Sequence, residues 1–436
     1  MRPPRQSPID SASPEVIDVR VEGLAPGGDA IGRQEGGLAD GRATFVALAA
    51  PGERVQARVT RQKARVAWAE LIEILEPSAL RVEPPCPLFG RCGGCQWQHV
   101  DLGAQRAAKQ AIVARALKRA DGALAAPVPD GWGYRDRAQF IVGPAGVIGF
   151  RARRSHDVVD VSRCLLLGPA LDAALAAIRA SAPVFEVDTE IDLQAGREGV
   201  HVALRLPRGS GSLRGVASKS TAEVPTLFSA LLDDWRGAGV VGLRVVAAGR
   251  EIALGAVDVD IAGAGGAGSA DEAPLRIPAG AFAQVGHAGN RALVDAVLRE
   301  VGSDPGAVLE LYAGSGNFTR GLVARASAVI ACDADRAAVM RGRRNVPTAV
   351  WMARPPGVVE ADTVVLDPPR DGLDAENLRA VVQARRRVVY VSCDPQTLGR
   401  DANRLAQSGL TLQSALALDL MPHTFHVEVV ARFDRA

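Results

Sequence analysis

One cysteine in this sequence stands where a nucleophile could act. Cys393 follows the apolar residues 388–391 and precedes Asp394 and Pro395. The apolar run predicts a buried β-strand that ends just before Cys393, and this edge of an open α/β sheet is where ligands and catalytic side chains gather. A thiol there is either a small core side chain or a nucleophile. The position alone leaves both interpretations open.

A glycine-rich turn and a carboxylate follow two further predicted strands. The turn Gly-Ser-Gly-Asn at 314–317 lies between a strand at 308–312 and a helix, and Asp333 ends the next strand. Glycines let a ligand approach the backbone, and a carboxylate at that strand end typically accepts hydrogen bonds from ribose hydroxyls. Because the turn lacks the GxGxxG fingerprint, the pattern favours S-adenosylmethionine over NAD. Two simpler interpretations stay open, in which Glu310 caps the turn and Asp333 caps a helix.

A second carboxylate indicates the kind of methylation. Asp367 ends another predicted strand and is followed by Pro-Pro-Arg370. Turns of this type that carry an aromatic residue serve amino-group methylation, in which the ring stacks on the target base. Arg370 replaces that aromatic residue, and Cys393 ends the next strand, which together favour methylation of a pyrimidine carbon. A thiolate that adds to carbon 6 makes carbon 5 nucleophilic, and a general base must then remove the C5 proton.

The candidate bases lie near the C-terminus. Glu428 is the carboxylate of the segment 421–428, and it enters an apolar strand that could raise its pKa. His423 and His426 are the alternatives. Because a lone histidine is more often structural, we favour Glu428.

Four other cysteines have a metal-binding pattern. Cys86, Cys92 and Cys95 lie in a Pro/Gly-rich loop, and Cys164 is the best candidate for a fourth ligand. All-thiolate ligation suits zinc or a [4Fe–4S] cluster. The spacing C-x5-C-x2-C with one distant cysteine favours the cluster, because structural zinc sites usually show two CxxC pairs. Four ligands would close the site, which argues for a structural role. We expect Cys332 to be structural as well.

Length and composition predict several domains. The chain has 436 residues, of which 47% are hydrophobic, and this suggests two or three domains. The net charge of +2 does not by itself indicate a nucleic-acid partner, but basic residues dominate between 100 and 155. No apolar run approaches the roughly 18–20 residues that span a bilayer. The N-terminus lacks an apolar signal core, and we therefore expect a cytoplasmic protein.

The periodicity changes twice along the chain. Short alternating strands with glycine turns predict a small β-barrel over residues 13–76, and residues 77–283 suggest an α+β domain that includes a helix at 102–120. From 284 to 436, alternating strands and helices predict a parallel, doubly wound sheet. One barrel hairpin is basic, through Arg58, Arg61, Lys63 and Arg65. It could contact phosphates or simply be solvated.

Together these motifs resemble the RNA 5-methyluridine methyltransferases. The four-cysteine set, Asp-Pro-Pro-Arg at 367–370, Ser-Cys-Asp-Pro at 392–395 and Pro-His-Thr-x-His-x-Glu at 422–428 carry the resemblance. It implies an N-terminal OB-like RNA-binding barrel called TRAM, an α+β central domain holding a [4Fe–4S] cluster, and a C-terminal α/β Rossmann-like methyltransferase domain. Having both barrel and cluster is most similar to the bacterial enzymes that methylate 23S ribosomal RNA.

The resemblance also assigns roles. It implies Cys393 as the nucleophile, Glu428 as the base and S-adenosylmethionine as the cofactor. Cofactor contacts would come from the loop before the last domain, the glycine turn and the strand ends, namely Gln284, Tyr312, Asn317, Asp333 and Asp367. Three departures stand out: the segment 341–359 is short and lacks an adenine contact, Asp333 stands where many relatives have Glu, and Gly286-His287 replaces polar residues.

The expected partner is RNA, with the target uridine out of its stack in a single-stranded loop. We expect a monomer that does not bind membranes. Three alternatives remain: the same chemistry on a tRNA uridine, a catalytically silent RNA-binding protein, and an amino-group methyltransferase.

Overall fold

The computed structural model describes residues 15–37, 39–119, 123–181, 185, 187–207, 223–247, 250–261, 274–358 and 360–436. Residues 13 and 14, the start of the predicted barrel domain, lie outside these ranges. Two compact units are present. The first ends at Pro85 and includes Gln96–Ala108, whereas the second holds Cys86–Cys95 and Lys109–Ala436.

The first unit contains the predicted barrel. Its closed sheet has the order β1-β2-β3-β5-β4. The strands are β1 (Val16–Leu24), β2 (Ala30–Glu35), β3 (Ala43–Ala47), β4 (Arg54–Lys63) and β5 (Val66–Glu76). Alternate side chains such as Val19, Val46 and Val55 are fully buried and fill the interior. The segment after residue 95 packs in the same unit, where Trp97 Nε1 donates to Gly28 O at 3.1 Å.

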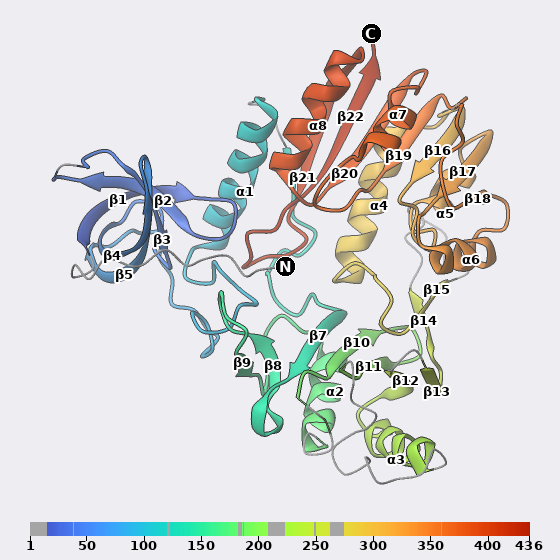
Figure 1. The fold of residues 1–436 in the computed structure, drawn as a ribbon, viewed down its shortest axis with the longest axis horizontal. Helices are drawn as coiled ribbons and strands as arrows, with labels where there is room; N and C mark the ends of the chain where they lie inside the picture. Colours follow the sequence, from blue (N-terminus) through green and yellow to red (C-terminus); the bar gives the residue numbers. More distant parts are fainter. Residues whose placement is uncertain are drawn as a thin grey trace, which may run out of the picture. The chain divides into compact units, whose positions relative to one another are not determined.

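A seven-stranded sheet forms the first part of the second unit, as the α+β prediction requires (Figure 1). Its order is β13-β12-β11-β10-β7-β8-β9. The strands are β7 (Arg137–Val142), β8 (Ile148–Arg151), β9 (Val158–Asp160), β10 (Glu190–Ala195), β11 (Val200–Arg205), β12 (Val240–Ala247) and β13 (Arg250–Gly255). The short 3-10 helix η1 (Pro144–Gly146) joins β7 to β8.

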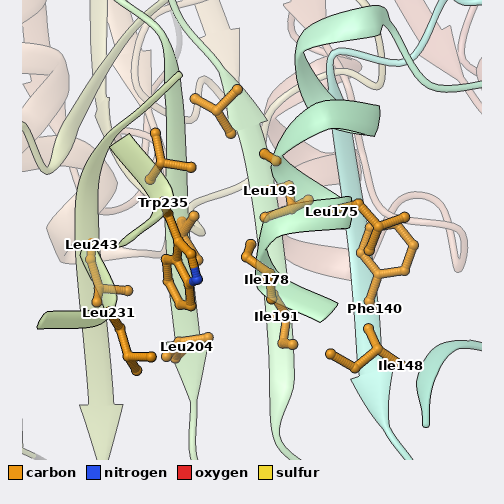
Figure 2. Packing of buried hydrophobic residues seen from close by; sticks show 14 of the residues in the cluster. Phe140, Ile148, Leu175, Ile178, Ile191, Leu193, Leu204, Leu231, Trp235 and Leu243 are labelled. Carbon is orange, nitrogen blue, oxygen red and sulfur yellow. The ribbon is translucent and has the colours of Figure 1, made fainter. Parts of the chain in front are cut away.

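Two helices cover one face of this sheet. They are α2 (Pro169–Ala180) and α3 (Glu223–Arg236). Figure 2 shows Leu175 and Ile178 of α2 and Trp235 of α3 packed on strand residues such as Leu193. The hairpin of β14 (Asp258–Ile261) and β15 (Leu275–Pro278) packs on the other face. The sheet is thus covered on both sides.

The C-terminal sheet has eight strands in the order β18-β17-β16-β19-β20-β22-β21-β6. They are β6 (Ala123–Ala125), β16 (Ala307–Leu311), β17 (Ala328–Cys332), β18 (Val350–Met352), β19 (Thr363–Leu366), β20 (Arg387–Ser392), β21 (Leu410–Leu418) and β22 (Glu428–Arg435). The strands from β18 to β20 are parallel, as predicted, whereas β22 runs antiparallel to both of its neighbours. The early strand β6 joins this sheet beside β21, although it precedes residue 284.

Helices cover both faces of the C-terminal sheet. One core contains residues of α4 (His287–Val301), α5 (Thr319–Val323) and α6 (Arg336–Asn345). The opposite core contains residues of α1 (Leu102–Leu117), α7 (Ala375–Val381) and α8 (Pro395–Gln407). This doubly wound arrangement leaves the carboxyl ends of the parallel strands as the place for a site. Within the described ranges, no helix combines the length and apolar character needed to cross a membrane.

Candidate active site

A cavity of about 780 Å³ brings together the predicted catalytic and cofactor residues. Its lining includes every one of them: Gln284, Tyr312, Asn317, Asp333, Asp367, Cys393 and Glu428. The volume lies within the range of ligand-binding clefts. Residues separated by as many as 144 positions in the sequence (284 to 428) therefore line one cavity. The strand-end argument placed Cys393, Asp333 and Asp367 at one sheet edge, whereas Gln284 was named only by the family resemblance.

The strand register places the thiol opposite the carboxyl group. Ser392 at the end of β20 pairs with Val429 of the antiparallel strand β22. The next residues outward along the two strands are Cys393 and Glu428, and directly opposed residues of an antiparallel pair point to the same face. Cys393 is half-buried, whereas Glu428 is 6% exposed.

Burial keeps both groups protonated over much of the neutral range. Burial and the neighbouring carboxyl groups of Glu428 and Asp367 raise the pKa of the Cys393 thiol to about 11, against the opposing effect of Arg370. Burial and Asp367 raise the pKa of Glu428 to about 8. Burial raises the pKa of Asp367 to about 7. The cavity therefore concentrates acidic groups whose negative charge a cationic ligand would stabilise.

The glycine turn and Asp333 form a second part of the cavity wall. Gly314 and Gly316 have positive φ angles of 57° and 107°, which glycine adopts without strain. The Asp333 carboxylate accepts hydrogen bonds from the backbone of Gly314 at 2.8 Å and of Asp335 at 2.8 Å. Asp335, rather than Asp333, caps α6. Each carboxylate oxygen of Asp333 retains acceptor capacity for a ribose hydroxyl.

Two further cofactor candidates are held from outside the turn. The side-chain amides of Asn317 and Asn290, the latter on α4, exchange hydrogen bonds of 2.8 and 3.0 Å. Tyr312 has φ of 60°, an uncommon value for a residue with a side chain. Its hydroxyl accepts a hydrogen bond from Asn377 Nδ2 at 2.9 Å. Strained backbone such as the positive φ of Tyr312 is often found at ligand sites.

Glu310, at the base of the glycine turn, is fully buried. Burial raises the pKa of its carboxyl group to about 8, and Thr319 donates a hydrogen bond to it.

Comparisons with known proteins agree with this geometry. Residues 14–72 match the TRAM domain family, and residues 358–435 match the family described as tRNA (uracil-5-)-methyltransferase. The chain is 32% identical to the 23S rRNA (uracil(1939)-C(5))-methyltransferase RlmD of Alkalilimnicola ehrlichii, over 97% of each chain. It is also 32% identical to the enzyme of that name from Klebsiella pneumoniae, over 97% of this chain and 96% of the relative. The chain belongs to the RNA (uracil-C5)-methyltransferase family.

A solved structure shares the fold of nearly the whole chain. The tRNA (uracil-54, C5)-methyltransferase of Pyrococcus abyssi, solved with S-adenosyl-L-homocysteine, has a TM-score of 0.71 at 22% identity. The similarity covers 96% of this chain and 100% of that one. The fold of the family therefore extends from the barrel to the last strand.

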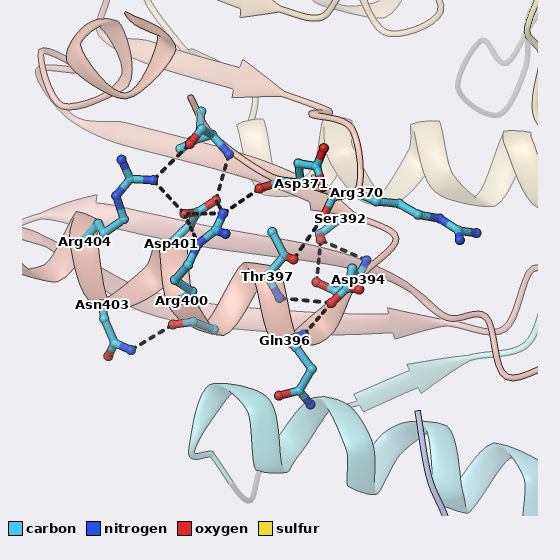
Figure 3. A network of polar contacts seen from close by, with 12 residues as sticks. Arg370, Asp371, Ser392, Asp394, Gln396, Thr397, Arg400, Asp401, Asn403 and Arg404 are labelled. Carbon is cyan, nitrogen blue, oxygen red and sulfur yellow. Dashed lines mark hydrogen bonds and ion pairs between the residues drawn. The ribbon is translucent and has the colours of Figure 1, made fainter. Parts of the chain in front are cut away.

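Helix α8 holds the end of β20, just before Cys393, and the neighbouring loop 370–373 through a network of polar contacts (Figure 3). Asp394 caps the helix by accepting from the backbone of Gln396 and Thr397 at 2.9 and 3.0 Å. Two turns later, the fully buried Asp401 accepts from Leu373 N and from the Tyr390 hydroxyl, both at 2.9 Å.

Arginines of α8 complete the attachment of the loop 370–373. Arg400 donates to Asp371 O at 2.7 Å, and Arg404 donates to Leu373 O at 3.0 Å. Thr397 Oγ1 donates to Arg370 O at 3.0 Å. The helix that begins beside Cys393 therefore also holds the loop that presents Arg370.

The segment that leads to Glu428 is fixed by a buried ion pair and an aromatic stack. Lys109 Nζ contacts Asp419 Oδ1 at 2.5 Å, and both side chains are fully buried. Lys109 also donates to Met421 O at 2.9 Å. His423 stacks on Trp132 with ring centroids 3.9 Å apart.

The two histidines of this segment differ in position. His426 lines the cavity, whereas His423 is not among the lining residues. Burial, with smaller effects of Arg370 and Lys109, lowers the pKa of His426 to about 4, so the imidazole is neutral at pH 7. The predicted preference for Glu428 over both histidines stays a prediction that this geometry favours.

Sequence patterns gave no indication of several cavity residues. Phe282, Arg137 and Gln194 line the wall contributed by the central sheet and the loop that follows β15. Phe282 is 77% exposed, which is unusual for a large apolar side chain, and Arg137 lies over its ring at 5.8 Å. A Phe two residues before the predicted Gln284 could have been noticed, but its exposure could not.

The cysteine loop and Cys164 supply thiols that could bind a metal, but the described side chains are not arranged as a closed metal site. All four cysteines are free, and Cys92 interacts electrostatically with Cys86 and Cys164. The Arg135 guanidinium interacts with Cys95 and Cys164, and its buried Nε has no hydrogen-bond partner among the described residues. This positive charge suits a group of thiolates. Among the residues that the structure describes, however, no three His, Cys, Asp or Glu side chains are grouped closely enough to hold a metal ion.

Proposed function

We propose that this protein transfers a methyl group from S-adenosylmethionine to carbon 5 of a uridine in 23S ribosomal RNA. The observation that carries the proposal is the opposed pair of Cys393 and Glu428 in the cavity that also contains the glycine turn and Asp333. The names of the relatives support 23S RNA as the substrate. A tRNA uridine is the second candidate, since the matched structure is a tRNA enzyme.

The chemistry divides between the two opposed residues. The Cys393 thiolate adds to carbon 6 of the uracil, which leaves an enolate whose carbon 5 is nucleophilic. S-adenosylmethionine, when bound, would supply the methyl group from its sulfonium, and breakage of that sulfur–carbon bond would leave S-adenosylhomocysteine. The Glu428 carboxylate then accepts the C5 proton. The electron pair of that C–H bond re-forms the C5–C6 double bond and expels the Cys393 sulfur.

The raised pKa of Glu428 suits this role. A carboxylate whose conjugate acid has a pKa of about 8 is a stronger base than an ordinary glutamate and still ionises near neutral pH. Arg370 lowers the pKa of both Cys393 and Glu428, and it therefore favours their reactive, charged forms. The predicted cofactor contacts of Gln284, Tyr312, Asn317, Asp333 and Asp367 belong to this proposal.

We also propose that Cys86, Cys92, Cys95 and Cys164 hold a [4Fe–4S] cluster. The spacing of the cysteines and the guanidinium of Arg135 beside two of them support it. The cluster would supply folding energy by joining the loop 86–95 to Cys164. Iron and labile sulfide should be found at about four each per chain, and Cys164→Ser should lose them while Cys332→Ser keeps them. Zinc without visible absorbance would contradict the cluster.

Substitution of the nucleophile tests the function. Cys393→Ala should abolish uracil methylation while leaving binding of RNA and of S-adenosylhomocysteine intact. Cys332→Ala, which removes a buried thiol elsewhere, is the control and should bind RNA like the wild type. Methylation is measured by transfer of a labelled methyl group to 23S ribosomal RNA, followed by nucleoside analysis. Methylated carbon 5 formed by Cys393→Ala would exclude the mechanism. Wild-type protein that binds RNA without methylating it would identify a silent RNA-binding protein.

A further inference from the structure

A buried amide without a partner lies in the wall of the active-site cavity. Gln194, near the end of β10, is 2% exposed and lines the cavity. Within the described part of the chain, neither its Oε1 nor its Nε2 has a hydrogen-bond partner. Buried side-chain amides are normally hydrogen-bonded, so both the donor and the acceptor of this group await one.

The strand register shows why the amide faces the cavity. Gln194 pairs with Arg137 of β7 on one side and with His201 of β11 on the other. Its strand neighbours Leu193 and Ala195 point to the opposite face, toward the core beneath α2 and α3. Arg137 is fixed by Asp192, with Nη2 to Oδ2 at 2.6 Å. His201 Nδ1 lies 2.8 Å from Ala256 O, whereas its Nε2, like the Gln194 amide, has no hydrogen-bond partner among the described residues.

The cavity walls near Gln194 suit a flat, partly apolar group. The hairpin of β14 and β15 packs against the same face of the sheet and lines the cavity with Ile261, Leu275 and Ile277. Phe282 adds an exposed aromatic ring to the lining. A planar ring with a polar edge could contact these apolar side chains and still reach the amide.

We propose that Gln194 pairs with the edge of a base of the RNA substrate. A side-chain amide presents one donor and one acceptor side by side, and nucleobases present matching pairs, such as N3–H and a carbonyl oxygen of uracil. RNA-binding proteins read unstacked bases in this way and stack them on aromatic side chains. This inference rests on the proposed function, because it assumes that RNA enters the cavity.

The adenine of the cofactor is the other nucleobase that could reach the amide. Four of the five cofactor candidates, Tyr312, Asn317, Asp333 and Asp367, follow strands of the C-terminal sheet, and Gln284 lies in the loop after β15, whereas Gln194 belongs to the central sheet. Phe282, which is exposed and contacted by Arg137 of the central sheet, is a surface that RNA can reach from outside. These positions favour a base from RNA.

The test replaces the amide with an apolar group of similar size. Gln194→Leu is compared with Gln139→Leu, a control on β7 whose side chain is exposed and bonded to Glu190. The probe is a fluorescently labelled fragment of 23S ribosomal RNA that contains position 1939, the uracil given in the names of the relatives. Its affinity is measured by fluorescence anisotropy in the presence of S-adenosylhomocysteine. Gln194→Leu should bind it roughly tenfold or more weakly, since a bidentate base contact has about that value. The control should match the wild type.

A series of RNA fragments identifies the base. Each nucleotide of the loop is replaced in turn by an abasic one, and the fragment lacking the contacted base should bind the wild type and Gln194→Leu equally. Gln194→Glu, which keeps the size and removes the donor, should show the same pattern and covers a failure of the leucine variant to fold. Thermal stability of free Gln194→Leu should equal or exceed that of the wild type, because no internal hydrogen bond is lost.

The other outcomes overturn the proposal. Weaker calorimetric binding of S-adenosylhomocysteine with unchanged RNA affinity would assign the amide to the cofactor. Unchanged affinity for both would mean that ordered water alone satisfies it. None of these measurements requires turnover, whereas methylation of the same fragment by the wild type tests the proposed function separately.

Discussion

At the scale of single residues, the active-site cavity disfavours the charges that its chemistry requires. The Cys393 thiol, with a pKa of about 11, is protonated at neutral pH, and the Glu428 carboxyl, with a pKa of about 8, is mostly protonated. Burial is the largest cause for both groups. A bound sulfonium would stabilise both anions, so the free protein holds the residues in a protonated state that the cationic cofactor can change.

The pKa of Glu428 leads to a pH prediction. Because only the carboxylate can accept the C5 proton, breakdown of the methylated covalent adduct, in which Cys393 is already bonded to carbon 6, should become faster as pH rises and level off above about 8. Glu428→Gln should react roughly 10²–10⁴-fold more slowly and accumulate the covalent protein–RNA adduct. Glu376→Gln, an exposed position on α7, is the control. A wild-type breakdown rate that does not change between pH 6 and 9 would exclude Glu428 as the base of that step.

The same substitution should change stability in the opposite direction. The folded pKa of Glu428 lies above its ordinary value of 4.5, so ionisation opposes folding as pH rises from 4.5 to about 8. At pH 7 the free Glu428→Gln protein should therefore be more stable than the wild type by roughly 1–3 kcal/mol, and at pH 4 the difference should vanish. Denaturant unfolding at the two pH values measures it.

At the scale of elements, α8 determines how Arg370 faces the catalytic pair. Its Asp401 joins the backbone of Leu373 to the hydroxyl of Tyr390 on β20. Gly372 has φ of 78°, and a Cβ there would lie 2.4 Å from Asp401 Oδ2. The loop can approach the helix this closely only because a glycine occupies that position.

Removal of the Asp401 carboxylate should therefore affect activity beyond its effect on folding. Asp401→Asn should lower stability by about 2–3 kcal/mol, through lost charge-assisted hydrogen bonds, and should raise the pKa of the Cys393 thiol as Arg370 becomes less fixed. The alkylation rate of Cys393 as a function of pH measures the second effect. Asp362→Asn, which loses a bond to Ala307 N at the amino ends of the strands, is the matched control. An unchanged alkylation profile in Asp401→Asn would contradict the positioning role.

Burial alone would raise the pKa of Asp401, but bonds from Arg400, Leu373, Arg404 and Tyr390 hold it below its usual value. A lowered carboxyl pKa contributes stability above the unfolded value near 4, and this stability is lost as pH falls through the folded pKa. The stability difference between the wild type and Asp401→Asn should therefore shrink below pH 4.

Local patterns in the sequence predicted the elements but not the contacts between them. The strand before Cys393, the glycine turn and the barrel strands follow from apolar runs and glycines over a few residues, and the structure confirms these elements. The pairing of β6 with β21 joins residues about 290 positions apart, and no local pattern encodes it. Local patterns also could not predict the hydrogen-bonded amides of Asn290 and Asn317 or the burial of Asp401, because each depends on the tertiary fold.

At the scale of the whole molecule, near-neutral charge conceals an uneven distribution. Lys and Arg number 51 and Asp and Glu number 49. Carboxyl groups with raised pKa values gather in the cavity, which suits a cationic cofactor. Exposed cations gather on the hairpin of β4 and β5, which suits RNA phosphates. The cavity therefore offers carboxyl groups that a cationic ligand would help to ionise, and the hairpin offers cations that RNA phosphates can contact.

This distribution predicts how salt affects RNA binding. Replacing the four exposed cations Arg58, Arg61, Lys63 and Arg65 with alanine should weaken RNA binding and reduce the slope of log affinity against log salt by up to about 3, at roughly 0.7 per phosphate contact on a single strand. Arg61 also lies over the ring of Trp68 at 3.8 Å, and its loss would leave a tryptophan face open on the same hairpin. Titrations between about 50 and 200 mM salt measure the slope.

The control separates contact from general charge. Arg33→Ala, on another barrel strand, removes an exposed cation that lies 3.5 Å from Glu22 and should leave the slope unchanged. Affinity for S-adenosylhomocysteine should be the same in all three proteins, because its candidate residues belong to the second unit. A slope that the fourfold variant shares with the wild type would mean that the hairpin is merely solvated, and that the basic residues between 100 and 155 carry the phosphate contacts instead.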